Sequence, residues 1–290
     1  MEQAVTVGLD GSVESLAAAH WAAGEALRHH RTLCLLHAWP LLSPTTVGAP
    51  SEADQNYWSK RLVDDARNEI HERCPDLPLT EALIAEDAKT ALLKAAAQSW
   101  MLVLGSRGLG PAESFFLGDI AMDVVGRAER PVTLVRAGTT STEPSATPAE
   151  GRVVVGLSLH GPCDGLLDFA FEAAAVRGVP LHAVHGRSLP VAAYAPWGVD
   201  PTVCDEIRAA ALKELGEVLR PWHERFPGVP MVTSVRLESP ARALVEAAPG
   251  SDLLVIGRRR HRPALAPRLG NVGHAAAHHA ACPLAIVPHD

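Results

Sequence analysis

The chain has 290 residues, 47% of them hydrophobic and 20% charged, which is a globular balance and a length that suggests about two domains. Its formal net charge of −7 argues against nucleic-acid binding, which normally needs a basic face. No apolar run approaches the roughly 20 residues that cross a bilayer, and no signal-peptide pattern opens the chain, so we expect a cytoplasmic protein without a membrane partner. Five cysteines without a CxxC pair indicate a reduced protein with no zinc site.

Short apolar runs alternate with longer helical patterns through the first half of the chain. The runs are nearly continuous, as expected for strands covered on both faces, and the alternation predicts βαβ units around a parallel sheet. Strands are expected at 4–9, 32–38, 79–85, 101–105 and 131–136, and helices at 13–30, 52–73, 88–98 and 119–128.

The second half repeats this pattern. "VTVGLDGS" at 5–12 is echoed by "VVVGLSLH" at 153–160, and "LVLGSRG" at 102–108 by "LVIGRRR" at 254–260. Such echoes, in the same order and at nearly constant offset, indicate two copies of one domain. Helices are expected near 164–177, 201–225, 240–248 and 271–280. We assign the copies to 1–137 and 151–290, joined by a polar linker at 138–150.

Two strand ends of the first copy carry unusual chemistry. Asp10 directly follows the first strand, and "LGSRGLGPAESFFLGD" at 104–119 follows the fourth. Parallel sheets bind ligands outside the carboxyl ends of their strands, where the winding reverses. Glycines let the backbone approach a ligand closely, and the free amides of a helix start hold anions. The phosphate loop GxxxxGK[ST] is absent, and the GxGxxG order of the dinucleotide fingerprint is absent too.

These stretches together resemble the universal stress protein family. The family pattern is Gly-x2-Gly-x9-Gly-Ser/Thr after an apolar strand, followed by a helix and a "CPV"-like strand. Here "GSRGLGPAESFFLGD" is followed by "RAERPVTLVR", and "VGLDGS" and "LLHAW" are similar as well. The resemblance covers both copies. It implies an α/β fold of two repeated, doubly wound, Rossmann-like sheets, each with five parallel strands in the order 3-2-1-4-5 and helices on both faces.

The resemblance also implies a ligand and an assembly. Many members bind ATP and pair through their fifth strands, and tandem members are similar to a dimer fused in one chain. We therefore expect intramolecular pairing of the two domains, and a homodimer of the whole chain. Carried over, Asp10 touches the ribose, and Leu9 and Ala38 line the adenine slot. The residues around the phosphates are Gly105, Arg107, Gly108 and Gly118, and Asp119 stands where the family has Ser or Thr.

Asp119 is a departure, because an ionised carboxylate cannot donate a hydrogen bond to phosphate. Two unit charges about 4 Å apart repel by roughly 4 kcal/mol at an effective dielectric near 20. Either Asp119 caps the helix that it opens and keeps the site empty, or a magnesium ion bridges it to a nucleotide.

The second copy departs further. Ser158 replaces Asp10, and the positions of the second glycine and of the hydroxyl residue hold Arg260 and Asn271, while Gly257 and Gly270 remain. The run Arg258 to Arg260 either attracts an anion or forms a solvated loop, and Arg260 is bulky enough to fill the nucleotide space. We expect this degenerate site to bind ATP poorly and the second copy to serve in domain pairing.

Several other polar residues favour structural roles. Ser12 is expected to cap a helix, Glu86 to lie in a solvated loop, and His37 and His185 to be hydrogen-bonded core residues. His274 and His278 have metal-ligand spacing, but no acid or cysteine accompanies them, so no metal site is assigned.

The first hypothesis is therefore a regulatory stress protein that binds ATP, mainly in the N-terminal copy. Little or no hydrolysis is expected, because no general base or water-positioning group is evident. The alternative is a nucleotide-free dimerising scaffold of the same fold. An enzyme of the related adenine-nucleotide α-hydrolase group is disfavoured, since "GLDGS" is too short for the phosphate loop that those enzymes place after the first strand.

Overall fold

A computed structural model describes residues 3–40, 52–106, 119–138, 151–189, 194–195, 198–260 and 269–290. The chain divides into two compact units, Met1–Thr142 and Glu143–Asp290. We call them the first and the second domain and describe each by itself. No helix within the described ranges combines the length and the apolar character that crossing a membrane requires.

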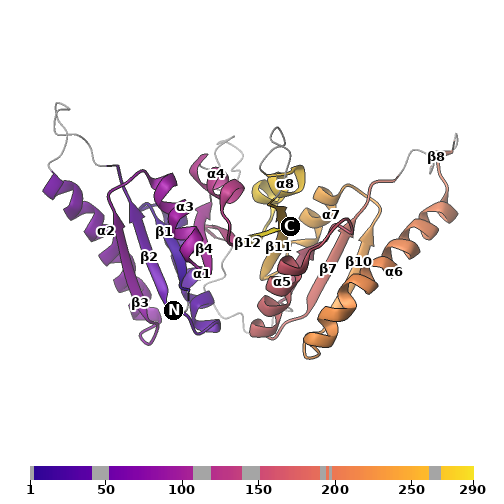
Figure 1. Ribbon diagram of the computed structural model, residues 1–290, viewed down its shortest axis with the longest axis horizontal. Coiled ribbons are helices and arrows are strands. Elements are labelled where there is room, and N and C mark those ends of the chain that lie inside the picture. The colour runs from indigo at the N-terminus through magenta and orange to yellow at the C-terminus, as the bar shows by residue number, and fades with distance from the viewer. Residues whose placement is uncertain are drawn as a thin grey trace. The chain divides into compact units, whose positions relative to one another are not determined.

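The first domain is built on five parallel strands in the order β3-β2-β1-β4-β5 (Figure 1). Helices α1 and α2 contact each other beside the sheet, and so do α3 and α4. The strands are β1 (Val5–Leu9), β2 (Leu33–Ala38), β3 (Leu79–Ile84), β4 (Met101–Ser106) and β5 (Val132–Arg136). The helices are α1 (Val13–Arg28), α2 (Glu52–Arg73), α3 (Ala88–Gln98) and α4 (Asp119–Arg127).

The second domain repeats this architecture, with parallel strands in the order β10-β7-β6-β11-β12. Its strands are β6 (Val153–Gly156), β7 (Leu181–Gly186), β10 (Met231–Arg236), β11 (Leu253–Arg259) and β12 (Leu284–His289). Its helices are α5 (Asp164–Arg177), α6 (Pro201–Arg225), α7 (Pro240–Ala247) and α8 (Asn271–His279). A short antiparallel pair, β8 (Tyr194–Ala195) and β9 (Gly198–Val199), precedes α6. The predicted order 3-2-1-4-5 is thus confirmed in both copies.

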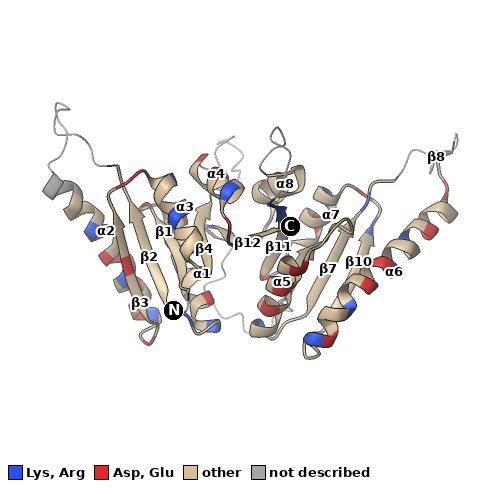
Figure 2. Cartoon of the chain, viewed as in Figure 1, with Lys and Arg blue, Asp and Glu red and all other residues tan. Residues whose placement is uncertain are grey.

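The cores lie along the central strands, where apolar side chains point to both faces. Val153, Val154 and Val155, consecutive on β6, are all fully buried, as continuous apolar runs in a parallel sheet require. The edge strands β3 and β10 are partly exposed. Figure 2 shows acidic and basic residues along α2 and α6, which pack on those edges, while the central strands carry almost none.

Most helix starts are closed by a side chain. Ser12, predicted to cap a helix, accepts a hydrogen bond from the Ser15 amide at the start of α1. Asp200 and Ser239 do the same for α6 and α7. At α5 and α8, the residues in the capping position, Cys163 and Gly270, make no such side-chain bond. The first amides of a helix without a side-chain cap can serve another acceptor.

Candidate functional site

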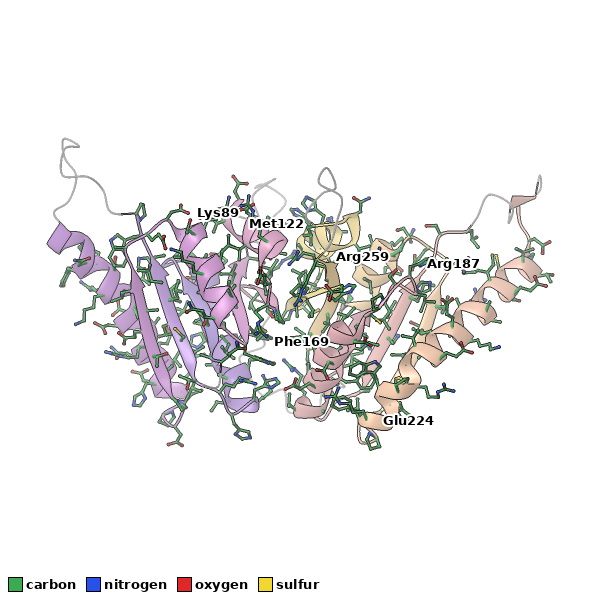
Figure 3. All side chains as sticks on the ribbon, viewed as in Figure 1. Lys89, Met122, Phe169, Arg187, Glu224 and Arg259 are labelled. Atoms are coloured by element: carbon green, nitrogen blue, oxygen red, sulfur yellow. The ribbon has the colours of Figure 1, made fainter. Side chains whose placement is uncertain are left out.

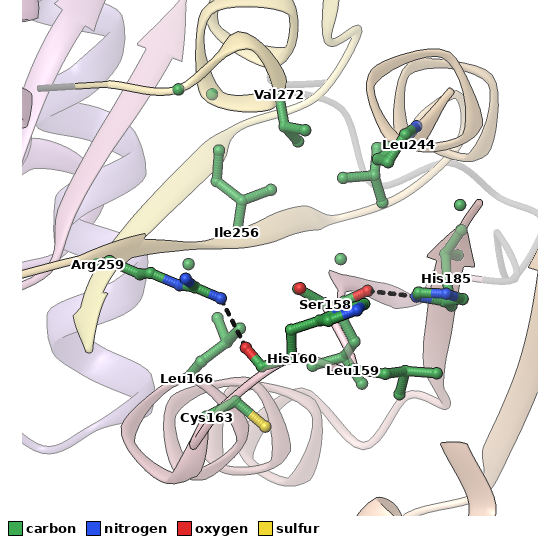
Figure 4. A pocket seen from close by; sticks show the side chains of 18 of the residues that line it. Ser158, Leu159, His160, Cys163, Leu166, His185, Leu244, Ile256, Arg259 and Val272 are labelled. Atoms are coloured by element: carbon green, nitrogen blue, oxygen red, sulfur yellow. Dashed lines mark hydrogen bonds between the residues drawn. The ribbon is translucent and has the colours of Figure 1, made fainter. Parts of the chain in front are cut away.

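A pocket of about 1190 Å³ opens in the second domain at the carboxyl ends of β6, β7 and β11, beside the start of α8 (Figure 4). Strands β7 and β11 flank β6, so the pocket lies where the winding of the sheet reverses, the usual ligand position in such folds. Four residues predicted for the second site, Ser158, Gly257, Gly270 and Asn271, line it. Arg260, predicted as the fifth, is not among the described lining residues.

The pocket combines an apolar wall with a few polar groups. Leu244, Ile256 and Val272 form part of the wall (Figure 4). His185, on β7, is 6% exposed, and its Nδ1 donates to the carbonyl oxygen of Leu157, 2.9 Å away. This bears out its expected role as a packed, hydrogen-bonded histidine. Ligand pockets in proteins commonly have this mixture of apolar surface and few polar groups.

The loop from Ser158 to Cys163, between β6 and α5, borders the pocket and is held by two side chains. Arg259 donates from Nη2 to the carbonyl oxygen of His160 at 2.6 Å (Figure 4). His289 contacts the carbonyl oxygen of Pro162 through Nδ1 at 3.1 Å. Arg259 and His289 are register partners on β11 and β12, so two neighbouring strands hold one loop.

The three arginines that the sequence groups together have different surroundings. Arg258 is 7% exposed, whereas Arg259 extends toward the loop at the pocket rim. Arg260 is exposed, and its backbone amide donates to the carbonyl oxygen of His289 at 2.7 Å. The period of two along a strand puts Gly257 and Arg259 on one face. Arg258, on the opposite face, lines the pocket as well.

The start of α8 offers the pocket its anion-binding chemistry. Gly270, in the capping position, is extended, with φ −74° and ψ 170°, and has no side chain to accept from the first turn. Asn271 and Gly273 line the pocket. The positive end of a helix dipole and unshared amides favour a negatively charged group there, and Arg259 adds a full positive charge nearby.

In the first domain, the predicted ribose residue Asp10 is exposed directly after β1. Its Oδ1 accepts from the amide of Ser12 at 2.9 Å and from the hydroxyl at 2.5 Å. Gly11 between them has φ +83°, a conformation that glycine adopts without strain. The carboxylate is thus oriented by a tight turn at the strand end.

The predicted adenine-slot residues lie beside this turn. Leu9 is buried and Ala38 is half-buried, on neighbouring strands. His37 contacts the carbonyl oxygen of Leu9 through Nδ1 at 2.8 Å and stacks on Trp39, with ring centroids 5.7 Å apart. The hydrogen bond repeats the one between His185 and Leu157, so the expected structural role of both histidines is confirmed.

Gly105 has a packing role that the sequence did not indicate. A Cβ built on it would lie 2.6 Å from the carbonyl carbon of Glu14 and 2.7 Å from the amide nitrogen of Ser15. Only a glycine lets β4 approach α1 this closely. Arg107, Gly108 and Gly118, the other predicted residues of the cradle, lie outside the described residues.

Asp119 is the first residue of α4 and is exposed. It therefore lies at the start of the first helical turn. A carboxylate there is stabilised by the helix dipole. It also places negative charge where an anionic ligand would approach the helix.

Two remaining predictions concern residues outside the pocket. Glu86 is half-exposed and pairs with Lys94 at 2.6 Å, as expected for a solvated loop residue. The rings of His274 and His278 lie edge to face with centroids 5.3 Å apart. Within the described ranges, no group of three or more histidine, cysteine, aspartate or glutamate side chains gathers as a metal site.

Comparison with known proteins gives one consistent family. The model of the universal stress protein family matches residues 1–136 and again 151–288. A curated universal stress protein of Mycobacterium tuberculosis is 29% identical over 98% of this chain and 97% of its own length. A crystal structure of a universal stress protein from Archaeoglobus fulgidus covers 99% of this chain and 98% of its own, with a TM-score of 0.69 and 15% identity. A family member from Arabidopsis thaliana, solved with AMP bound, covers 48% of this chain at a TM-score of 0.34 and 20% identity.

Proposed function

The chain belongs to the universal stress protein family, and from this premise we propose that it is a stress-response regulatory protein that binds adenine nucleotide such as ATP. Nucleotide binding, with little or no hydrolysis, is the step by which it senses the state of the cell. The ligand class follows from the family resemblance and from the chemistry of the pocket.

The observation that carries the proposal is the pocket of about 1190 Å³ against the uncapped start of α8. A nucleotide has an apolar base at one end and a multiply charged phosphate group at the other. The wall with Leu244 and Ile256 suits the base. The amides of α8 and the guanidinium of Arg259 suit the phosphates. The second domain is therefore a better candidate than its sequence suggests.

The first domain contributes a second proposed site, built from the residues that the family resemblance assigns. Asp10 is already oriented by Ser12 at the end of β1, in a position to accept hydrogen bonds from ribose hydroxyls. Asp119 at the start of α4 opposes phosphate binding unless a cation lies between them. We propose that magnesium is needed in this domain and not in the second, where Asn271 carries no charge.

Little hydrolysis is proposed because no carboxylate among the described lining residues is placed near the expected phosphate position. Among the described residues that line the second-domain pocket, Glu214 is the one carboxylate. It belongs to α6, which packs on β10, whereas α8 packs on β11 and β12 at the other side of the sheet. A general base must come within hydrogen-bond reach of the attacking water.

A nucleotide-free scaffold, with paired domains and chains, is the second candidate. The exposed carboxylate of Asp119 favours it, because this charge discourages phosphate in the first domain.

Calorimetric titration of ATP into the full chain, with and without magnesium, separates the two functions. Binding that needs no magnesium, weakens on Arg259→Gln and survives Arg208→Gln supports the nucleotide proposal. Arg208 is a matched control because it pairs with Asp205 on α6 and is not among the lining residues. If no heat of binding is measured with or without magnesium, the nucleotide-free scaffold is the supported function.

A further inference from the structure

We propose that the second-domain pocket selects a nucleotide that carries anionic groups on both sides of its ribose. Arg259 binds one of these groups and Arg187 binds the other. The inference rests on the proposed nucleotide function and adds to it a ligand class for one domain.

The register of the sheet places Arg187 and Arg259 at the same distance along the strand direction, beyond the ends of their paired residues. Gly156 on β6 pairs with Val184 on β7 and with Ile256 on β11. Arg187 and Arg259 each follow their paired residue by three positions. Since neighbouring strands are about 4.8 Å apart, the two backbones lie about 10 Å apart across the pocket. Strand β6 ends at Gly156, and Ser158 and His160 in the loop that follows it line the pocket as well.

Both guanidinium groups keep their charge available. Arg187 is exposed, lines the pocket and has no ion pair with any described residue; its backbone amide extends the ladder to the carbonyl oxygen of Arg236 at 2.9 Å. Arg259 also lacks a carboxylate partner among the described residues, because its hydrogen bond goes to the neutral carbonyl of His160. Figure 3 labels Arg187 at the end of β7 and Arg259 at the end of β11.

The hydrogen bond from Arg259 to the carbonyl oxygen of His160 orients the guanidinium group before a ligand binds. A guanidinium has five N–H donors, so one can serve the loop while others face an anion. Holding the side chain in advance reduces the entropy lost on binding. Glu214 opposes anion binding as the one carboxylate among the described lining residues, which include three arginines, Arg187, Arg258 and Arg259.

The first domain provides an internal contrast. The spacing that relates His37 to His185 also relates Trp39 to Arg187. Trp39 stacks on His37 and carries no charge. The second anionic group of a ligand would therefore lie near the cation Arg187 in the second domain, but near the aromatic ring of Trp39 in the first. The two domains should consequently differ in the nucleotide that they prefer.

The test compares AMP with adenosine 3′,5′-bisphosphate by calorimetric titration into the full chain. The bisphosphate keeps the base and the 5′-phosphate of AMP and carries a second phosphate group in place of the 3′-hydroxyl. We expect it to bind about fivefold more tightly than AMP, as suits an exposed charge pair. In Arg187→Gln this gain disappears while the affinity for AMP stays within twofold. In Arg259→Gln the affinity for both nucleotides falls, and Arg208→Gln matches the wild type.

The possible outcomes distinguish the two-anion selectivity from the proposed nucleotide binding on which it rests. If AMP binds and the bisphosphate gains nothing, or if its gain survives Arg187→Gln, the two-anion selectivity is wrong and the nucleotide function stands. If neither nucleotide nor ATP binds the wild type, both fall together. Arg187 is exposed, so its substitution leaves the fold intact, which a thermal melt checks.

Discussion

His185 is joined to Leu157 by a hydrogen bond of 2.9 Å that ties the end of β7 to the end of β6 beside the pocket. His37 and Leu9 form the same bond at 2.8 Å in the first domain. A carbonyl oxygen only accepts, so Nδ1 carries the proton in both histidines. Both domains therefore have the same hydrogen bond between their two neighbouring strand ends, although the residues that face the proposed ligand differ.

Replacing His185 with Phe should destabilise the second domain by about 1–3 kcal/mol, because the buried carbonyl of Leu157 loses its donor. His37→Phe should cost less, since His37 is more exposed and water can replace it. Urea unfolding of the two variants measures the difference. Equal and negligible shifts would mean that the hydrogen bond contributes nothing to the fold.

Gly105→Ala should destabilise the first domain by about 1–3 kcal/mol, because the added methyl group meets the backbone of Glu14. Gly257→Ala is the matched control at the same position of the repeat. Its methyl group would meet the side chain of His289, which can move, so a smaller loss is expected. Thermal unfolding decides, and a larger loss for Gly257→Ala would refute the packing role given to Gly105.

His182 should make the second domain sensitive to acid. Burial lowers its pKa, and the positive charges of Arg152 and Arg236 lower it further. The unfolded chain therefore takes up the proton first as pH falls, and the stability due to neutral His182 is present above about pH 6.5 and lost below it. Stability of the wild type relative to His182→Gln should fall between about pH 7.5 and pH 5. A constant difference over this range contradicts the assignment.

The first residues of α4 and α8 should control phosphate binding in opposite directions. Asp119→Asn removes a negative charge from one helix start, and Asn271→Asp adds one to the other. We expect the first change to tighten magnesium-free ATP binding by about tenfold or more, and the second to weaken it by a similar factor. Calorimetry in the absence of magnesium measures both. Parallel changes in the same direction would show that these positions do not face the phosphates.

The sequence was sufficient for the architecture, because each element carries its own pattern. The predicted helix at 52–73 is observed as Glu52–Arg73, and the one at 88–98 as Ala88–Gln98. Continuous apolar strands and the repeat predict two parallel sheets, whereas the strand order came from the resemblance to the family. The β8–β9 pair was missed, since strands of two residues are too short to show a period.

The site was harder to predict, because motif positions say which residues are near a ligand but not what else they touch. Gly105 serves close packing against Glu14, a long-range contact with no local signal. The sequence suggested that Arg260 fills the second site, whereas Arg258 and Arg259 are the arginines of this run among the described lining residues. The bond from Arg259 to His160 depends on the path of a loop, which no local pattern predicts.

A crystal structure of the full chain grown with ATP tests the central claim most directly. The nucleotide proposal predicts ATP density in the second-domain pocket, with phosphates within hydrogen-bond distance of the first amides of α8 and of Arg259. The base should lie against the wall that contains Leu244 and Ile256. An empty second-domain pocket at saturating ATP, or phosphates directed away from α8, would contradict it.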